Sequence, residues 1–119
     1  MSLIERLKKA RLGDQEPAAP MPAPSDAPLV RRRFHFFGVV QGVGFRYEAQ
    51  RIASRLELVG WVKNLGDGSV VVEIEGAANY IEAFLMTLEA VPRFDITEIR
   101  RKDLPPLRRE SSFRALYEW

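Results

Sequence analysis

Residues 38–50 read GVVQGVGFRYEAQ, and within this run the residue pattern changes from that of a strand to that of a helix. The residues just before it, 33–40, are rich in Phe and Val, which is typical of a β-strand. Gly42 and Gly44 interrupt this strand and allow the chain to turn. After the turn, apolar residues recur at helical spacing, at Phe45, Ala49, Ile52, Ala53 and Leu56. The run therefore predicts a strand, a glycine loop and an amphipathic helix in direct succession.

The same two periods alternate through the rest of the chain. Further strands are predicted at residues 58–63, 69–76, 94–102 and 113–117, and a second amphipathic helix at residues 80–88. Between the second and third strands lies NLGDG, which has the composition of a tight turn. The element order is βαββαβ followed by a short extra strand. This order predicts an α+β, ferredoxin-like sandwich with a mainly antiparallel sheet and both helices on one face.

Residues 1–29 have a different composition from the rest. Leu3, Ile4 and Leu7 show helical spacing, but a segment of this length is marginal as an isolated helix. Residues 14–28 then contain five prolines interleaved with alanines, which favours an extended linker. We therefore predict a flexible N-terminal extension at residues 1–29 and a single domain at residues 30–119.

The overall composition limits the function classes. The chain has 119 residues with 46% hydrophobic and 29% charged residues, an ordinary globular balance. The absence of cysteine excludes disulfides, thiolate zinc sites and cysteine nucleophiles. No apolar run is long enough for a membrane helix, and the N-terminus lacks the apolar core of a secretory signal. These features predict a cytoplasmic protein with no membrane partner.

The basic residues do not predict a nucleic-acid partner. The formal net charge is only +2, which supplies little general attraction for phosphate backbones. The densest basic runs are residues 31–33 and 100–102. We interpret both runs as solvated strand ends.

The loop that ends at Arg46 has the features of an anion site. Its glycines allow left-handed backbone conformations that point consecutive N–H groups inward, and the first N–H groups of a helix have no partners within the helix. An arginine at a helix start is electrostatically unfavourable there, since the N-terminal dipole prefers negative charge. A bound phosphoryl group would satisfy both the N–H groups and the guanidinium.

Other interpretations of this loop are left open by the residues alone. A dinucleotide fingerprint would need a third glycine where Tyr47 stands, and the Gly-Lys-Ser/Thr ending of a nucleotide P-loop is missing. Two glycines between a strand and a helix are also compatible with a plain turn.

Taken together, GVVQGVGFRYEAQ at residues 38–50 and GWVKNLGDGSV at residues 60–70 closely resemble the acylphosphatase family. The resemblance covers residues 33–117. It implies an enzyme that hydrolyses acyl phosphates to a carboxylate and inorganic phosphate. With one histidine and no suitably grouped carboxylates, the residues themselves predict no metal or other cofactor. The resemblance also implies that Arg46 binds the phosphoryl group and that Asn64 orients the attacking water. The phosphate oxygens would be held by backbone N–H groups of Gln41, Gly42, Val43, Gly44 and Phe45.

Topology independently predicts that Arg46 and Asn64 meet. A right-handed β-α-β crossover makes the first two strands parallel, and in this fold the third strand lies between them. Arg46 follows the end of the first strand, and Asn64 lies at the end of the second. Two strand spacings separate their backbones by roughly 10 Å. An arginine side chain, a phosphoryl group and a water can fill that distance.

The sequence leaves other functions open and predicts structural positions for several further polar residues. A non-catalytic anion-binding or adaptor module with the same fold is the main alternative, while an RNA-binding sheet would need more exposed aromatic residues than Phe37. We expect a small-molecule substrate and a monomer. His35 is expected on the sheet face opposite Phe34 and Phe36, Glu48 at a solvated helix position, and Asp67 in the hairpin turn.

One departure from the family pattern concerns the backbone. Glu57 follows the first helix where the family usually has glycine. Only glycine adopts a left-handed helix-ending conformation without strain. The turn at Glu57 is therefore expected either to differ or to be strained.

Overall fold

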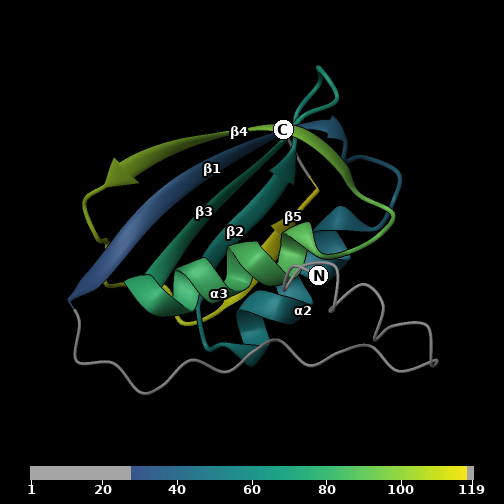
Figure 1. Ribbon diagram of the computed structural model, residues 1–119. Coiled ribbons are helices and arrows are strands. Elements are labelled where there is room, and N and C mark those ends of the chain that lie inside the picture. The colour runs from purple at the N-terminus through teal and green to yellow at the C-terminus, as the bar shows by residue number, and fades with distance from the viewer. Residues whose placement is uncertain (1–27, 118–119) are drawn as a thin grey trace.

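The computed structural model describes residues 28–117 (Figure 1). The elements are β1 (Leu29–Val39), α2 (Phe45–Arg55), β2 (Val59–Asn64), β3 (Val70–Ala77), α3 (Ala78–Glu89), β4 (Asp95–Leu104) and β5 (Phe113–Leu116). This order confirms the predicted βαββαβ arrangement with an extra strand. The predicted N-terminal extension, residues 1–29, lies outside the described residues except for its last two.

The strands form one sheet in the order β4-β1-β3-β2-β5. β1 pairs antiparallel with β3 and β4, β2 pairs antiparallel with β3, and only the β2–β5 pair is parallel. Since β1 and β2 both run antiparallel to β3, they are parallel to each other with β3 between them, as the crossover predicted. The C-terminal ends of β1 and β2 therefore lie at the same edge of the sheet.

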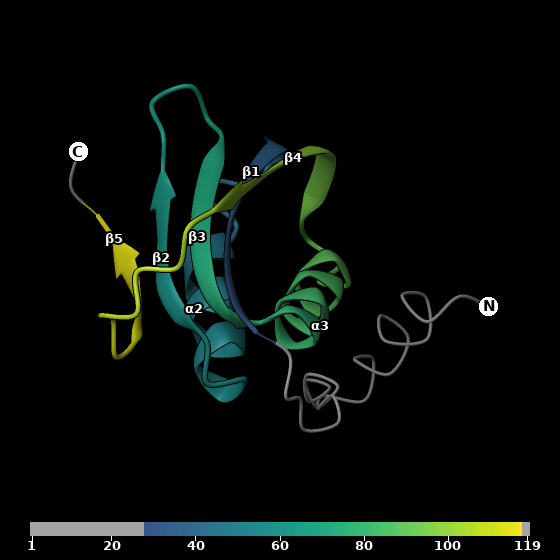
Figure 2. The same cartoon turned by 90° about the vertical axis from the view of Figure 1, so that its left-hand side faces the viewer.

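Both helices pack on one face of the sheet (Figure 2). The side chains of β1 point alternately to the two faces of the sheet. Phe34 and Phe36 point toward the helices and are fully buried. The helices complete the core with Ile52 and Phe84, which are also fully buried. Neither helix among residues 28–117 has the length and apolar character needed to cross a membrane.

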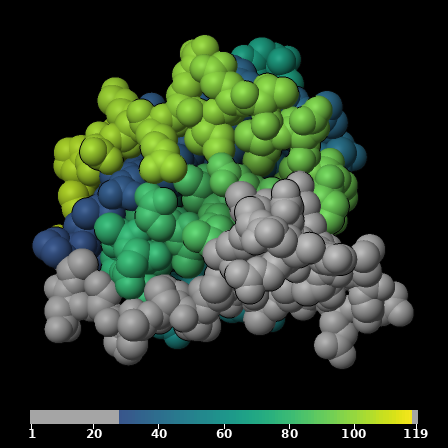
Figure 3. Space-filling model, viewed as in Figure 1, coloured from purple at the N-terminus to yellow at the C-terminus, as the bar shows by residue number. Residues whose placement is uncertain are grey.

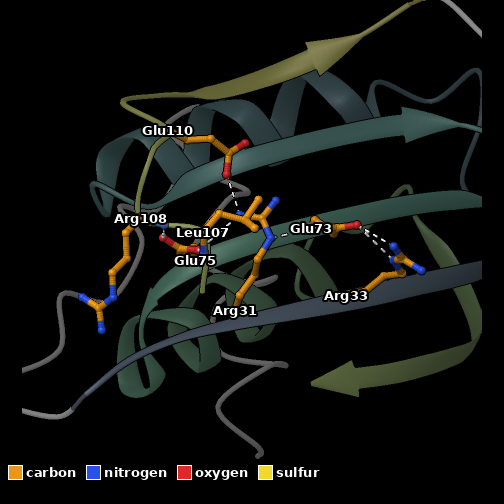
Figure 4. A network of polar contacts seen from close by, with 7 residues as sticks. All are labelled: Arg31, Arg33, Glu73, Glu75, Leu107, Arg108 and Glu110. Carbon is orange, nitrogen blue, oxygen red and sulfur yellow. Dashed lines mark hydrogen bonds and ion pairs between the residues drawn. The ribbon is translucent and has the colours of Figure 1, made fainter. Parts of the chain in front are cut away.

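The other face of the sheet is crossed by residues 105–112, which connect β4 to β5 (Figure 2). The Glu75 carboxylate on β3 accepts hydrogen bonds from the backbone N–H groups of Leu107 at 2.7 Å and Arg108 at 3.1 Å. A contact beside it joins the Arg31 guanidinium to Glu110 (Figure 4). The connecting segment is therefore fastened to the sheet by carboxylates and backbone N–H groups.

Arg31 corrects one sequence interpretation. Its side chain is only 2% exposed, and its guanidinium also donates to Glu73 at 2.9 Å and to Glu75 at 3.3 Å. The interpretation of Arg31 as part of a solvated strand end is therefore wrong, because residues 105–112 cover it. Arg33 and residues 100–102 are exposed, as expected.

The end of α2 has the backbone that the glycine of the family would favour. The Leu58 N–H donates to the Ala53 carbonyl at 2.9 Å and the Glu57 N–H to the Ser54 carbonyl at 3.1 Å, the pair of bonds that defines a Schellman motif. Glu57 has φ 57°, in the left-handed region. The turn is thus retained, and the expected strain falls on Glu57.

We expect Glu57→Gly to stabilise the protein by about 0.5–1 kcal/mol, since glycine removes the steric cost of a left-handed Cβ. Urea unfolding followed by Trp61 fluorescence measures this. Glu57→Ala is the matched control, because it removes the same charge but keeps the Cβ, and we expect no gain from it. An equal gain in both variants would assign the effect to charge rather than to φ.

Candidate active site

The loop between β1 and α2 ends in a left-handed glycine. Gly44 is the N-cap of α2, with φ 81° and ψ 22°, and no side chain among residues 28–117 caps the helix there. Gly42, two residues earlier, also has a positive φ of 75°. The first N–H groups of α2 therefore have no side-chain acceptor and are suited to an anion.

A pocket of about 190 Å³ opens at this helix start. Its lining residues come from the loop, the first turn of α2, the end of β2 and the residue after β5. They are Val40, Gln41, Gly42, Gly44, Phe45, Arg46, Tyr47, Asn64 and Tyr117. Every sequence-predicted site residue lines the pocket except Val43, which packs against the hydrophobic core instead.

Arg46 is oriented by the C-terminal strand. Its Nη1 donates to the Leu116 carbonyl of β5 at 3.2 Å. The Tyr117 ring lies against the guanidinium, with 4.1 Å between Cζ and the ring centroid. The sequence predicted the strand at residues 113–117 but gave Tyr117 no role at the site. The local pattern does not show that this strand pairs with β2, and so it does not show that Tyr117 lies beside Arg46.

Asn64 is the last residue of β2 and presents an acceptor without a partner. Its Oδ1 is buried, and no hydrogen-bond donor reaches it within residues 28–117. A buried acceptor left in this state costs roughly 1–3 kcal/mol. A bound molecule that donates a hydrogen bond would remove this cost.

Gln41 joins the glycine loop to the β2–β3 hairpin. Its side-chain amide donates to the Leu65 carbonyl at 2.7 Å and to the Ser69 carbonyl at 2.9 Å. Leu65 directly follows Asn64, so these bonds hold the loop that precedes Arg46 beside the residue that carries the carboxamide. The sequence reasoning used only the backbone of Gln41 and missed this role of its side chain.

The prediction for Glu48 is wrong. Glu48 is buried, with only 2% of its surface exposed, rather than solvated. The carboxylate accepts hydrogen bonds from Arg51 at 2.8 and 3.0 Å and from Arg93 at 3.3 Å. Arg93 follows α3 and is distant in sequence, which explains why helical periodicity alone did not indicate a buried charge.

Asp67 and His35 lie where the sequence predicted. The Asp67 carboxylate accepts hydrogen bonds from the hydroxyl and the backbone N–H of Ser69 in the hairpin turn, and these bonds lower the pKa of Asp67. His35 contacts the Ser69 hydroxyl at 2.6 Å and stacks on Phe37, on the sheet face away from the helices. Neither residue lines the pocket, so neither has a place in the chemistry there.

A larger hollow of about 520 Å³ lies beside β4, but its charge does not suit a phosphate. Glu89, Asp95 and Glu98 line it, together with apolar residues. These carboxylates repel an anion. Across residues 28–117, no group of three or more His, Cys, Asp or Glu side chains is placed to hold a metal ion.

The chain matches a known protein family over most of its length. The family model described as Acylphosphatase matches residues 32–115, which include the loop, Arg46 and Asn64. The chain belongs to the acylphosphatase family. This membership confirms the predicted enzyme class, a hydrolase that cleaves acyl phosphates.

Individual acylphosphatases support the assignment. That of Geobacillus thermodenitrificans is 42% identical over 83 residues, which cover 67% of this chain and 86% of that protein. That of Bifidobacterium longum is 40% identical over 80 residues, 66% of this chain and 82% of that protein. The crystal structure of acylphosphatase from Bacillus subtilis superposes with a TM-score of 0.69 at 35% identity, covering 74% of this chain and 99% of that one. The expected ferredoxin-like acylphosphatase fold is thereby confirmed.

Proposed function

We propose that this acylphosphatase cleaves its substrate in the pocket at the start of α2, by in-line attack of water on the phosphoryl group. Backbone N–H groups of residues 41–45 and the Arg46 guanidinium hold the phosphoryl oxygens, and Asn64 orients the water. One observation carries the proposal: the glycine loop, Arg46 and Asn64 line one small pocket, and the buried Asn64 Oδ1 has no hydrogen-bond partner within residues 28–117.

The electrostatics of the loop favour the transition state. In phosphoryl transfer, charge is spread over the non-bridging oxygens while the attacking and leaving oxygens lie roughly in line. Fixed N–H dipoles and a guanidinium aimed at those oxygens stabilise the charge without reorganising. The positive charge of Arg46 lies at the positive N-terminal end of the α2 dipole, which is unfavourable without a ligand. The negative charge of a bound phosphoryl group offsets both.

Asn64 provides the acceptor that a water needs. A water that donates one hydrogen bond to Oδ1 satisfies this buried atom and directs its own lone pair at phosphorus. The water oxygen forms the new bond to phosphorus, and the bond from phosphorus to the acyl oxygen breaks, with its electron pair leaving on the carboxylate. The water proton passes to a phosphate oxygen, since a weakly basic carboxylate needs no general acid.

The proposal also includes the cellular compartment and the oligomeric state of the enzyme. The sequence favours the cytoplasm, and the site requires only one copy of the chain, so we include a monomer in the proposal. The alternative is a module with the same loop that binds an anion without turnover.

Asn64→Ala is expected to reduce kcat for benzoyl phosphate by about 10²–10³-fold, the usual effect of losing one positioned hydrogen-bonding group in an active site. KM should change little, because the loop and Arg46 still hold the phosphoryl group. The assay is release of inorganic phosphate with EDTA present, since no step of the proposal uses a metal.

Gln50→Ala is the matched control, because it removes another carboxamide from outside the pocket. We expect turnover close to that of the wild type. Near-normal kcat in Asn64→Ala would contradict its assigned role. Binding of inorganic phosphate by calorimetry without any turnover of the wild type would favour the non-catalytic module.

A further inference from the structure

A second arginine contacts the glycine loop from outside the pocket. Arg93 lies in the turn between α3 and β4, and its Nε donates to the Val43 carbonyl at 2.6 Å. Its Nη2 donates to Glu48 at 3.3 Å. A Cβ built on Gly44 would lie 3.2 Å from the same Nη2. One guanidinium therefore touches both the loop and the first turn of α2.

The turn that carries Arg93 is itself well fixed. Backbone bonds join the Val91 N–H to the Leu88 carbonyl and the Phe94 N–H to the Val91 carbonyl, each at 3.2 Å. Phe94 is buried, and its ring packs on Phe45 with 4.9 Å between centroids. Arg93 thus extends from a rigid base beside the residue that begins α2.

Glu48 fixes the direction of the Arg93 side chain. The Glu48 carboxylate is buried and uses Oε2 for Arg51 and Oε1 for Arg93. A planar guanidinium held at two of its nitrogens has little rotational freedom. The contact to the Val43 carbonyl therefore has a defined orientation, although Arg93 is 45% exposed.

The geometry of a peptide unit links this contact to the phosphate site. In a trans peptide, the carbonyl of one residue and the N–H of the next point in opposite directions. Arg93 holds the Val43 carbonyl on a side away from the pocket, since Arg93 is not among the lining residues. The N–H of Gly44 consequently points away from Arg93, and Gly44 itself lines the pocket.

We propose that Arg93 is a positioning residue that holds the Val43–Gly44 peptide in the orientation that binds phosphate. This inference rests on the proposed function of the loop. Gly42 and Gly44 make the loop backbone permissive, and such a peptide can rotate unless something holds it. When only a fraction of molecules has the binding-competent loop, apparent affinity falls by that fraction. The role belongs to substrate and phosphate binding, because a bound phosphate selects the competent loop and the enzyme at saturation then has it in nearly every molecule.

Arg93→Ala is expected to raise both the KM for benzoyl phosphate and the inhibition constant of inorganic phosphate by about tenfold, with kcat changed less than threefold. Arg93→Lys should recover little, since a single ammonium cannot reproduce the planar two-point contact. In ¹⁵N spectra, the Gly44 amide signal of the free protein should differ between the wild type and Arg93→Ala, and the two signals should approach each other at saturation with phosphate.

Arg101→Ala is the matched control, because it removes an equally charged, exposed arginine from β4, and both constants should stay within twofold of the wild type. Urea unfolding checks that each variant is folded, and Arg93→Lys carries the test if Arg93→Ala is not. Full recovery by Arg93→Lys would indicate simple charge attraction and overturn the proposal. Unchanged constants in folded Arg93→Ala would overturn it too, whereas inactivity of the wild type would refute the proposed function instead.

Discussion

Replacing Arg46 with alanine should lower kcat/KM for benzoyl phosphate at least about 10²–10³-fold. The guanidinium has five N–H donors in a fixed fork, and Nη1 uses one on the Leu116 carbonyl at 3.2 Å. The fork can therefore be anchored by β5 and still donate to phosphoryl oxygens. Steady-state kinetics with benzoyl phosphate, together with the inhibition constant of inorganic phosphate, measure the loss.

Two variants separate the fork from its charge. Arg46→Lys keeps the charge but loses bidentate geometry, so we expect it to regain only a small part of the activity. Arg55→Ala removes an exposed arginine from the last turn of the same helix and should leave kcat/KM within twofold. An Arg46→Ala enzyme that kept more than a tenth of wild-type kcat/KM would refute the assigned role.

The local residue pattern around the loop predicted much of the fold. The change from strand to helix period at Gly42–Phe45 predicted β1 and α2, and the crossover rule predicted that β1 and β2 are parallel, with β3 between them in this fold. The family glycine missing at Glu57 predicted strain, which appears as its φ of 57°. The first two features depend on residues adjacent in sequence or on a rule of chain connection, and the third depends on the resemblance to a family, so all three can be predicted from one sequence.

The contacts that sequence reasoning missed join residues distant in sequence. Glu48 is buried because Arg93, 45 residues later, lies over it. Arg31 is buried because Glu110, 79 residues later, crosses the sheet with its segment. Periodicity identifies the face of an element that meets the core, but it does not show which loop covers the opposite face. Polar residues on that second face are therefore the hardest to predict.

The crossing segment connects the fold to the site. Residues 105–112 are fastened to β3 by Glu75 and to β1 by Arg31, and they lead directly into β5. β5 places the Leu116 carbonyl on Arg46, and Tyr117 follows it with its ring on the same guanidinium. The buried charges on the far face of the sheet therefore help to hold the orientation of Arg46, although none of them lines the pocket.

Arg31→Ala is expected to destabilise the protein by about 3–5 kcal/mol, because within residues 28–117 it leaves the buried Glu75 carboxylate without its cation, while Glu73 keeps only its pairing with Arg33. Burial by itself would raise the pKa values of Glu73 and Glu75, but hydrogen bonds from Arg33 and Arg31 to Glu73, and from Leu107, Arg108 and Arg31 to Glu75, outweigh it and lower both. A carboxyl group whose pKa is lower in the folded protein stabilises the fold at pH values above its unfolded pKa of about 4.3. This stabilisation is lost as the pH falls through the folded pKa. Urea unfolding between pH 3 and pH 7 measures both effects.

Removing Arg31 removes hydrogen bonds that lower the pKa values of Glu73 and Glu75, so burial should raise both pKa values. The variant should therefore lose stability at a higher pH than the wild type. Arg33→Ala is the matched control, because Arg33 lies on the same strand and face but is 44% exposed and, within residues 28–117, bonds only to Glu73. We expect a loss of at most about 1 kcal/mol. Adding Glu73→Gln and Glu75→Gln to Arg31→Ala should restore part of the stability, since the unpaired charges are then gone. Equal unfolding midpoints for Arg31→Ala and Arg33→Ala would show that the buried network does not hold the crossing segment, and the link from β1 to Arg46 would then fail with it.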